Sequence, residues 1–222
     1  KKRYEATQAR RNATDAEADT GEVTPISTIT YEYANAWDHN PSRVVDALGG
    51  VTELNWEGGL LTSLTGPEGV SMTLNYDEFG NLTSFADQEG NTTSFTYTAA
   101  GHLAQVTTPL GLTTSFTHDA AGNITGRQDP DGSRWKFEYT AGRRLVAVID
   151  PSGARTSYEY GPSGDMTAVI DPLGRRTERT FDENGNVATV TLPNGGVFSY
   201  VWDGLSRLIR TVDPAGGHWE NT

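Results

Sequence analysis

The chain has 222 residues and is acidic, because 17 Lys and Arg against 29 Asp and Glu give a formal net charge of −12. This charge argues against a nucleic-acid-binding function, since phosphate contacts need a basic surface. No apolar run is long enough to span a membrane as a helix. The chain has no cysteine, which excludes disulfides and thiolate metal sites and is compatible with a reducing or an oxidising compartment.

Residues 1–30 differ from the rest of the chain. Lys2–Ala18 contains no glycine or proline and many good helix formers, and Gly21 and Pro25 would end a helix there. We therefore expect a non-repeat segment over residues 1–30, either a helix, a linker or a docking element, followed by a repeat domain over residues 31–222. The basic start, Lys1–Arg3, is not followed by an apolar stretch, so it does not predict a signal peptide.

A repeat begins weakly and then becomes regular. Tyr33, Asp46 and Gly49 suggest a first loose unit. A clearer unit, one residue short in its first turn, contains Trp56, Leu61, Pro67 and Gly69. Self-similarity at a fixed period predicts a repeat architecture.

From residue 76 onward the period is 21 residues without insertion or deletion. A ring side chain recurs at Tyr76, Tyr97, His118, Tyr139, Tyr160, Phe181 and Trp202. Fourteen residues after each ring stands a glycine: Gly90, Gly111, Gly132, Gly153, Gly174, Gly195 and Gly216. Twelve residues after each ring, the first unit has Gln88 and the others have Pro109, Pro130, Pro151, Pro172, Pro193 and Pro214. We interpret these as structural repeat positions.

Each unit contains two turn signals. In Asp129-Pro130-Asp131-Gly132, the aspartate is suited to accept hydrogen bonds from turn amides, proline presets φ, and glycine takes a position that needs positive φ. The second signal has the same form without proline, as in Asp77-Glu78-Phe79-Gly80. A type I turn followed by a left-handed glycine is a common hairpin connection, so each unit is predicted to be a pair of strands.

The segments between the turns have the composition of strands. Asn81–Ala86 and Asn91–Tyr97 are rich in threonine and aromatic residues. Phe95 and Tyr97 alternate with polar residues and should therefore lie on one face. In the other strand of a unit, Leu145 and Val148 are three residues apart, which leaves open whether a bulge intervenes or both faces are partly buried.

The predicted fold is all-β: tandem antiparallel hairpins of 21 residues that form one curved strip of roughly 16 strands. Twisted open sheets of more than about 10 strands rarely remain flat. Sheets curled through so many strands enclose a space that side chains do not fill. The physical expectation is a curved wall around a cavity.

Tyr76-Asp77-Glu78-Phe79-Gly80-Asn81-Leu82 and Trp202-Asp203-Gly204-Leu205-Ser206-Arg207-Leu208 resemble the YD repeat of Rhs proteins, teneurins and the cocoon-like subunits of insecticidal toxin complexes. The resemblance covers about residues 56–222. It implies a long β-strip that spirals into a hollow shell. In bacterial members such a shell typically encloses a C-terminal toxin, and in teneurins it forms an extracellular barrel used in adhesion.

No motif predicts a catalytic residue, a metal site or a cofactor. The aspartates fall at turn positions, and the chain has no metal-binding His pattern, nucleophile elbow or P-loop. The four histidines are scattered: His39, His102, His118 and His218. Asp171-Pro172-Leu173-Gly174-Arg175 resembles the self-cleavage segment of bacterial shells, but the repeat continues after it. We interpret it as an ordinary turn and expect one uncleaved band of about 24 kDa, the mass of the chain.

The leading functional hypothesis is a structural shell segment of a secreted or cell-surface Rhs-type protein, with no enzymatic activity of its own. Its expected partners are the remaining shell and the toxin cargo of the same polypeptide, with self-association through exposed edge strands. The alternative is an extracellular adhesive or carbohydrate-binding repeat module of the teneurin kind. Binding repeats with ligand cages use clustered aromatic residues, whereas the five tryptophans here occupy differing repeat positions.

Overall fold

The computed structural model describes residues 3–8, 27–35 and 39–220 of the chain. The described residues fold into two compact units, with the division between Thr113 and Thr114. Strands of the first unit are β1 (Arg3–Gln8), β2 (Ser27–Glu32), β3 (Arg43–Val45), β4 (Val51–Glu57), β5 (Leu60–Thr65), β6 (Ser71–Tyr76), β7 (Leu82–Asp87), β8 (Thr92–Tyr97) and β9 (Leu103–Thr107), with one 3-10 turn, η1 (Pro67–Gly69).

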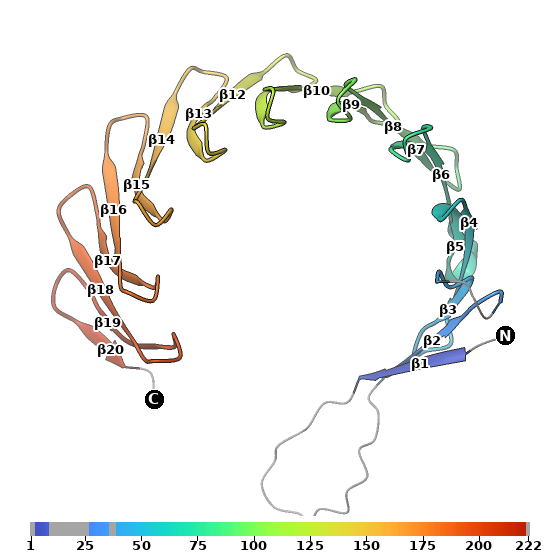
Figure 1. Cartoon of the computed structure of the whole chain (residues 1–222), viewed down its shortest axis with the longest axis horizontal. Coiled ribbons are helices and arrows are strands. Elements are labelled where there is room, and N and C mark those ends of the chain that lie inside the picture. Colours follow the sequence, from blue (N-terminus) through green and yellow to red (C-terminus); the bar gives the residue numbers. More distant parts are fainter. Residues whose placement is uncertain (1–2, 9–26, 36–38, 221–222) are drawn as a thin grey trace, which may run out of the picture. The chain divides into compact units, whose positions relative to one another are not determined.

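Strands of the second unit are β10 (Thr113–His118), β11 (Ile124–Gln128), β12 (Arg134–Tyr139), β13 (Leu145–Ile149), β14 (Arg155–Tyr160), β15 (Met166–Ile170), β16 (Arg176–Phe181), β17 (Val187–Thr191), β18 (Val197–Trp202), β19 (Leu208–Val212) and β20 (His218–Glu220). Within each unit every strand pairs antiparallel with its neighbour in sequence, and the resulting strip of hairpins bends (Figure 1). The all-β hairpin prediction is confirmed.

Of the alternatives expected for the segment before residue 31, a helix does not form in the part of Lys2–Ala18 that the structure describes. Arg3–Gln8 forms β1, which pairs antiparallel with β2 in a register that joins Arg3 to Glu32 and Gln8 to Ser27. Residues 9–26 lie outside the described part of the chain. β2 also runs across the boundary expected at residue 30. The described residues form 20 strands, whereas roughly 16 were expected; three of the 20, β1 to β3, precede β4. Pairing with a neighbouring strand has overridden local helix propensity here.

The turns match their sequence signals closely. In the turn after β13, the Gly153 amide donates to the Asp150 carbonyl at 3.0 Å and the Asp150 amide donates to the Ala154 carbonyl at 3.0 Å. All seven glycines that follow the repeat rings by 14 residues have positive φ, from +74° at Gly174 to +88° at Gly153. The predicted left-handed glycine is therefore confirmed at each of them.

A β-bulge resolves the question left open by Leu145 and Val148. Tyr139 lies opposite Leu145 and Glu138 lies opposite Ala147, so Val146 is an extra residue in β13. Because of this extra residue, Leu145 and Val148 both lie opposite residues of the aromatic face of β12. The same register shift recurs at the repeat ring of the units from Trp56 onward, including Trp56, Tyr97 and Trp202.

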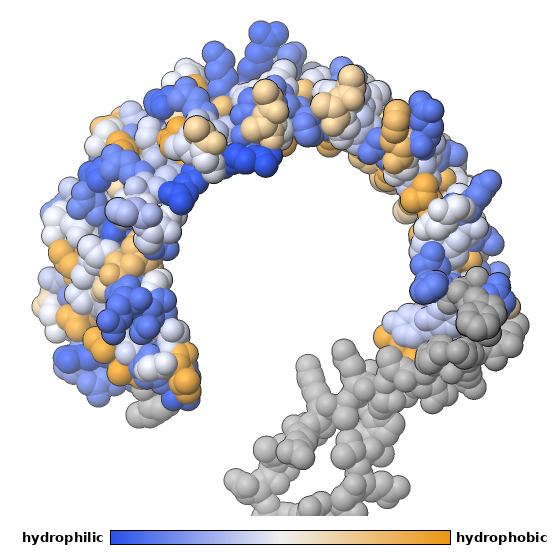
Figure 2. Space-filling view, viewed as in Figure 1, coloured by the Kyte–Doolittle hydropathy of each residue, from blue (hydrophilic) through white to orange (hydrophobic). Residues whose placement is uncertain are grey.

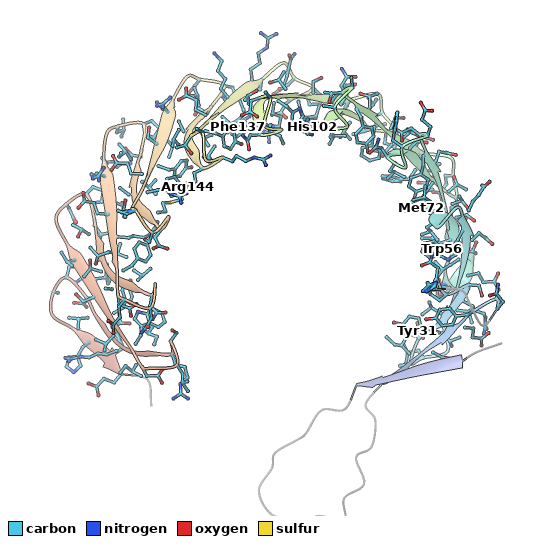
Figure 3. All side chains as sticks on the ribbon, viewed as in Figure 1. Tyr31, Trp56, Met72, His102, Phe137 and Arg144 are labelled. Atoms are coloured by element: carbon cyan, nitrogen blue, oxygen red, sulfur yellow. The ribbon has the colours of Figure 1, made fainter. Side chains whose placement is uncertain are left out.

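The strip is a single layer of sheet. Among the described residues the only buried hydrophobic side chains are Ala147 and Ala168, and no large side chain is fully buried. Side chains project from both sides of the ribbon in each unit (Figure 3). In the space-filling view, hydrophobic residues are interspersed with hydrophilic ones and do not form one patch (Figure 2). Stability must therefore come from contacts between neighbouring strands rather than from a packed interior.

Candidate functional surface

The strip offers two chemically different faces. On β12, Phe137 and Tyr139 alternate with the exposed Lys136 and Glu138. Residues directly opposite each other in an antiparallel pair lie on the same face. Phe137 lies opposite Val148 and Glu138 lies opposite Ala147. We call the side with Phe137 the aromatic face and the side with Glu138 the polar face.

On the aromatic face, the repeat rings of Tyr76, Tyr97, Tyr160 and Trp202 donate hydrogen bonds to the preceding unit. The Tyr160 hydroxyl donates to the Leu145 carbonyl at 2.8 Å, and the Tyr97 hydroxyl donates to the Leu82 carbonyl at 2.8 Å. Trp202 achieves the same with its indole Nε1, which donates to the Val187 carbonyl at 2.8 Å. Each acceptor is the residue just before the extra residue of a bulge, where the strand ladder is interrupted. The ring thus ties one hairpin to the previous one and satisfies a carbonyl that the bulge exposes.

On the polar face, ion pairs cross a strand above a small residue. Arg155 Nη2 of β14 lies 2.8 Å from Glu138 Oε2 of β12. β13 runs between these strands, and its Ala147 lies between Glu138 and Ser157 in the register. Ala147 is 0% exposed because the ion pair lies over it.

The same arrangement recurs one repeat later. Both Nη atoms of Arg176 bond to the carboxylate of Glu159, at 2.7 and 2.8 Å, and Arg176 also pairs with Glu178. Here the strand crossed is β15, with Ala168 in the position of Ala147 and likewise 0% exposed. Sequence reasoning missed this motif, although Glu, Ala and Arg recurring 21 residues apart was a readable signal.

The turn aspartates are occupied by their own turns. Asp150 Oδ1 accepts from the amides of Ser152 and Ala154, at 2.8 and 2.9 Å. Hydrogen bonds from the Ser152 hydroxyl and these amides lower the pKa of the Asp150 carboxyl. In the turns without proline, the side chain of an asparagine is the main donor and lowers the pKa of Asp77, Asp119 and Asp182.

Asp129 is an exception to the predicted capping role. Its Oδ2 pairs with Arg127 Nη2 at 2.8 Å, and the Ser133 amide donates to Asp131 Oδ1 instead. A second carboxylate in this turn competes for the amide, so Asp129 is available for the arginine beside it.

Asp171 has the contacts of an ordinary turn. Its Oδ1 accepts from the amides of Leu173 and Arg175, each at 2.9 Å, and Arg175 Nε bonds to Oδ2 at 2.6 Å. Asp203 makes the same three contacts with Leu205 and Arg207. That the chain is not cleaved at Asp171 remains a prediction.

The described residues contain no cluster of three or more metal-ligating side chains. His118 lies in β10, as the repeat predicted. No helix of the described residues is long and apolar enough to cross a membrane. The depressions on the surface are shallow, and one of about 610 Å³ is lined by Phe79, Phe95 and Tyr97.

Solved structures of toxin-complex proteins have the same fold. The chain aligns with a crystal structure of TcdB2–TccC3–TEV at a TM-score of 0.70 and 15% identity over 86% of this chain. It aligns with a crystal structure of TcdB2–TccC3 without the hypervariable C-terminal region at a TM-score of 0.68 and 15% identity, over 86% of this chain. The alignment with the Photorhabdus luminescens Tc holotoxin pore has a TM-score of 0.65 and 15% identity, over 96% of this chain. At this identity the likeness establishes the fold.

The chain spans only 12% of each of the two TcdB2–TccC3 chains and 14% of the holotoxin chain. A search of curated proteins finds no match. The family model described as Teneurin YD-shell matches residues 70–220. This match covers more than half of the chain, the matched residues hold the regular repeats and their bulges, and the chain therefore belongs to the teneurin YD-shell family.

Proposed function

We propose that this segment is part of the wall of an Rhs-type shell that encloses a C-terminal toxin of the same polypeptide. The observation that carries the proposal is a single-layer strip whose two faces differ, without a packed core among the described residues. A wall needs such a strip, because one face meets the contents and the other meets solvent. A secreted or cell-surface parent protein and a role without catalysis belong to the same proposal.

In this proposal the aromatic face is the inner one. Apolar surface is costly to expose to water, and rings such as Phe137, Tyr158 and Tyr200 are concentrated on that face. The polar face carries ion pairs that are between 39% and 50% exposed, such as Arg176 with Glu159, which tolerate solvent.

Single-cysteine variants of the parent polypeptide test the proposal, because this segment has no cysteine of its own. Tyr158→Cys reports on the aromatic face, and Glu183→Cys, in the exposed turn between β16 and β17, is a matched surface control. We expect a bulky maleimide to label the Glu183→Cys variant rapidly, and the Tyr158→Cys variant at least about tenfold more slowly while the shell is closed. Equal labelling of both variants in the intact parent would contradict a closed wall.

The second candidate function is glycan binding by an adhesive module. It is favoured by one observation, the depression where Phe79, 81% exposed, lies beside Phe95 and Tyr97. Exposed rings are a common platform for sugars. Binding of this chain on a glycan array, lost in Phe79→Ala and kept in Leu173→Ala, would favour adhesion over enclosure.

A further inference from the structure

The polar face contains one repeat that keeps the arginine of the crossing ion pair without its carboxylate. The positions of Glu138, Ala147 and Arg155 correspond, 21 residues earlier, to Thr117, Gly126 and Arg134. The register is equivalent, because Gly126 lies opposite Thr117 on one side and Lys136 on the other. The arginine is kept in this repeat, and the carboxylate that it would bind is replaced by a threonine.

The place of the missing carboxylate is open space. A depression of about 380 Å³ is lined by Thr117, Gly126, Gln128, Arg134 and Lys136, among others. Gly126 forms its floor, and a Cβ there would lie 2.7 Å from Thr117 Oγ1. The side-chain hydroxyl of Thr117 is 3.2 Å from that of Thr125, so it is held at the rim.

Three cationic residues line this depression. Arg127 pairs with Asp129, and no carboxylate of the described residues forms an ion pair with Arg134 or Lys136. Arg134 and Lys136 alternate on β12 and therefore point to the same face. The acidic groups nearby are engaged elsewhere: Glu138 with Arg155, Asp129 with Arg127, and Asp131 with the Ser133 amide. Glu138 contributes an electrostatic attraction to Lys136 without an ion pair.

We infer that this depression, the Arg134 site, binds a carboxylate supplied by another molecule. The ligand carboxylate would take the position that Glu138 and Glu159 occupy in the next two repeats, with Arg134 as a two-pronged donor and Lys136 as a second cation. The net charge of −12 does not prevent this. Charges more than about 8 Å away are screened at physiological salt, so the two adjacent cations determine the local potential. Affinity should be in the millimolar range, because the site is open to water.

The test uses the whole 222-residue chain labelled with ¹⁵N and a tripeptide probe, acetyl-Ala-Glu-Ala-amide, with acetyl-Ala-Gln-Ala-amide as the neutral control. We expect the Arg134 Nε–H and Gly126 amide resonances to shift saturably with the glutamate probe and not with the glutamine probe. Equal shifts with both probes would overturn the inference. Acetate in the same titration distinguishes the sources: equal affinity assigns the site to any free carboxylate, and tighter binding of the peptide assigns it to an acidic side chain on a protein segment.

Two sets of variants give independent evidence. Thr117→Glu with Gly126→Ala reproduces the next repeat, so its own glutamate should occupy the site and reduce probe affinity at least about tenfold. Arg134→Gln, at an exposed position, should have the same effect even if the double variant folds poorly. Conversely, Glu138→Thr with Ala147→Gly should release Arg155 and create a second site. Undiminished glutamate-probe binding in Arg134→Gln would overturn the assignment.

Discussion

Gly153 illustrates how a single residue determines a turn in this chain. Its φ is +88°, and a Cβ added there would have no neighbour within 4 Å, so any cost of substitution is backbone strain and not a clash. The equivalent position of the second turn accepts Arg143 at φ 64° and Ser206 at φ 57°. Left-handed backbone is thus tolerated by other residues at a cost of about 1 kcal/mol each.

We predict that Gly153→Val lowers the free energy of unfolding by about 1 kcal/mol or more, because a β-branched side chain is strained at positive φ. Urea denaturation followed by tryptophan fluorescence measures this. Gly153→Ala should also lower the free energy of unfolding, but by a smaller amount. Gly204→Ala is the matched control, since Gly204 lacks positive φ and also has open space around it. Equal costs at the two glycines would contradict the strain argument.

The hydroxyl of Tyr160 has a separate effect. Tyr160→Phe removes the donor to the Leu145 carbonyl at 2.8 Å and should destabilise the chain by about 1 kcal/mol in urea denaturation. Phe181 occupies the same repeat position without a hydroxyl, so Phe181→Tyr is the control in the opposite direction. Phe181→Tyr should leave the free energy of unfolding unchanged or increase it. A neutral Tyr160→Phe would mean that water replaces the phenol at no cost.

At the scale of the strand, β13 and β15 combine a bulge with a buried alanine. The bulge brings Leu145 into line with Val148 on the aromatic face, and the alanine two residues after Leu145 leaves room for the ion pair on the other face. The two features explain why these strands have apolar residues on both faces. They also explain why a simple alternation of polar and apolar residues is absent from their sequence.

Ala168→Leu tests the second feature. The added side chain would displace Arg176 from Glu159, and overpacking should cost about 1–3 kcal/mol in chemical denaturation. Arg210→Leu is the matched control, because Arg210 is at the same repeat position, two units later. Its own ion pair, with the exposed Glu220 of the neighbouring strand at 3.9 Å, does not cross β19. Arg210→Leu should change stability by less than about 0.5 kcal/mol. A tolerated Ala168→Leu would show that the ion pair does not confine the alanine.

At the scale of the molecule, the turn carboxylates act together on stability. Hydrogen bonds, of which those from the side chains of Asn81, Asn123 and Asn186 have the largest effect, hold the pKa values of Asp77, Asp119 and Asp182 below the ordinary value of an aspartate. A lowered folded-state pKa stabilises the fold above the unfolded pKa, and this stabilisation is lost as pH falls through the folded-state value.

We therefore expect the melting temperature to be flat from about pH 5 to 7 with respect to these groups and to fall progressively below about pH 4. Thermal melts followed by circular dichroism across this range test the expectation. Asp182→Asn should reduce the acid sensitivity of its hairpin. Stability that rises on acidification below pH 4 would contradict the sign.

The edge of the sheet should determine how this chain behaves in solution. Among the described residues β20 pairs only with β19, and Trp219 on β20 is 60% exposed. Exposed edge strands pair with other chains unless they are charged or covered. We predict a mass above 24.0 kDa by static light scattering that rises with protein concentration. Trp219→Lys should shift the chain toward monomer, and a constant monomer mass for the unmodified chain would contradict edge pairing.

The sequence by itself determined the hairpin repeat, the turn type and the glycines with positive φ, because these depend on local backbone sterics that recur every 21 residues. The tertiary structure alone decided the bulge at Val146 and the ion pairs that cross β13 and β15, since register depends on which residues of two strands face each other. It also decided that Arg3–Gln8 is a strand, because pairing with β2 is a contact between residues up to 29 positions apart. The open Arg134 site has the same origin: the change from Glu to Thr is visible in the sequence, but only the pairing of β10, β11 and β12 shows that it leaves an arginine beside an empty space.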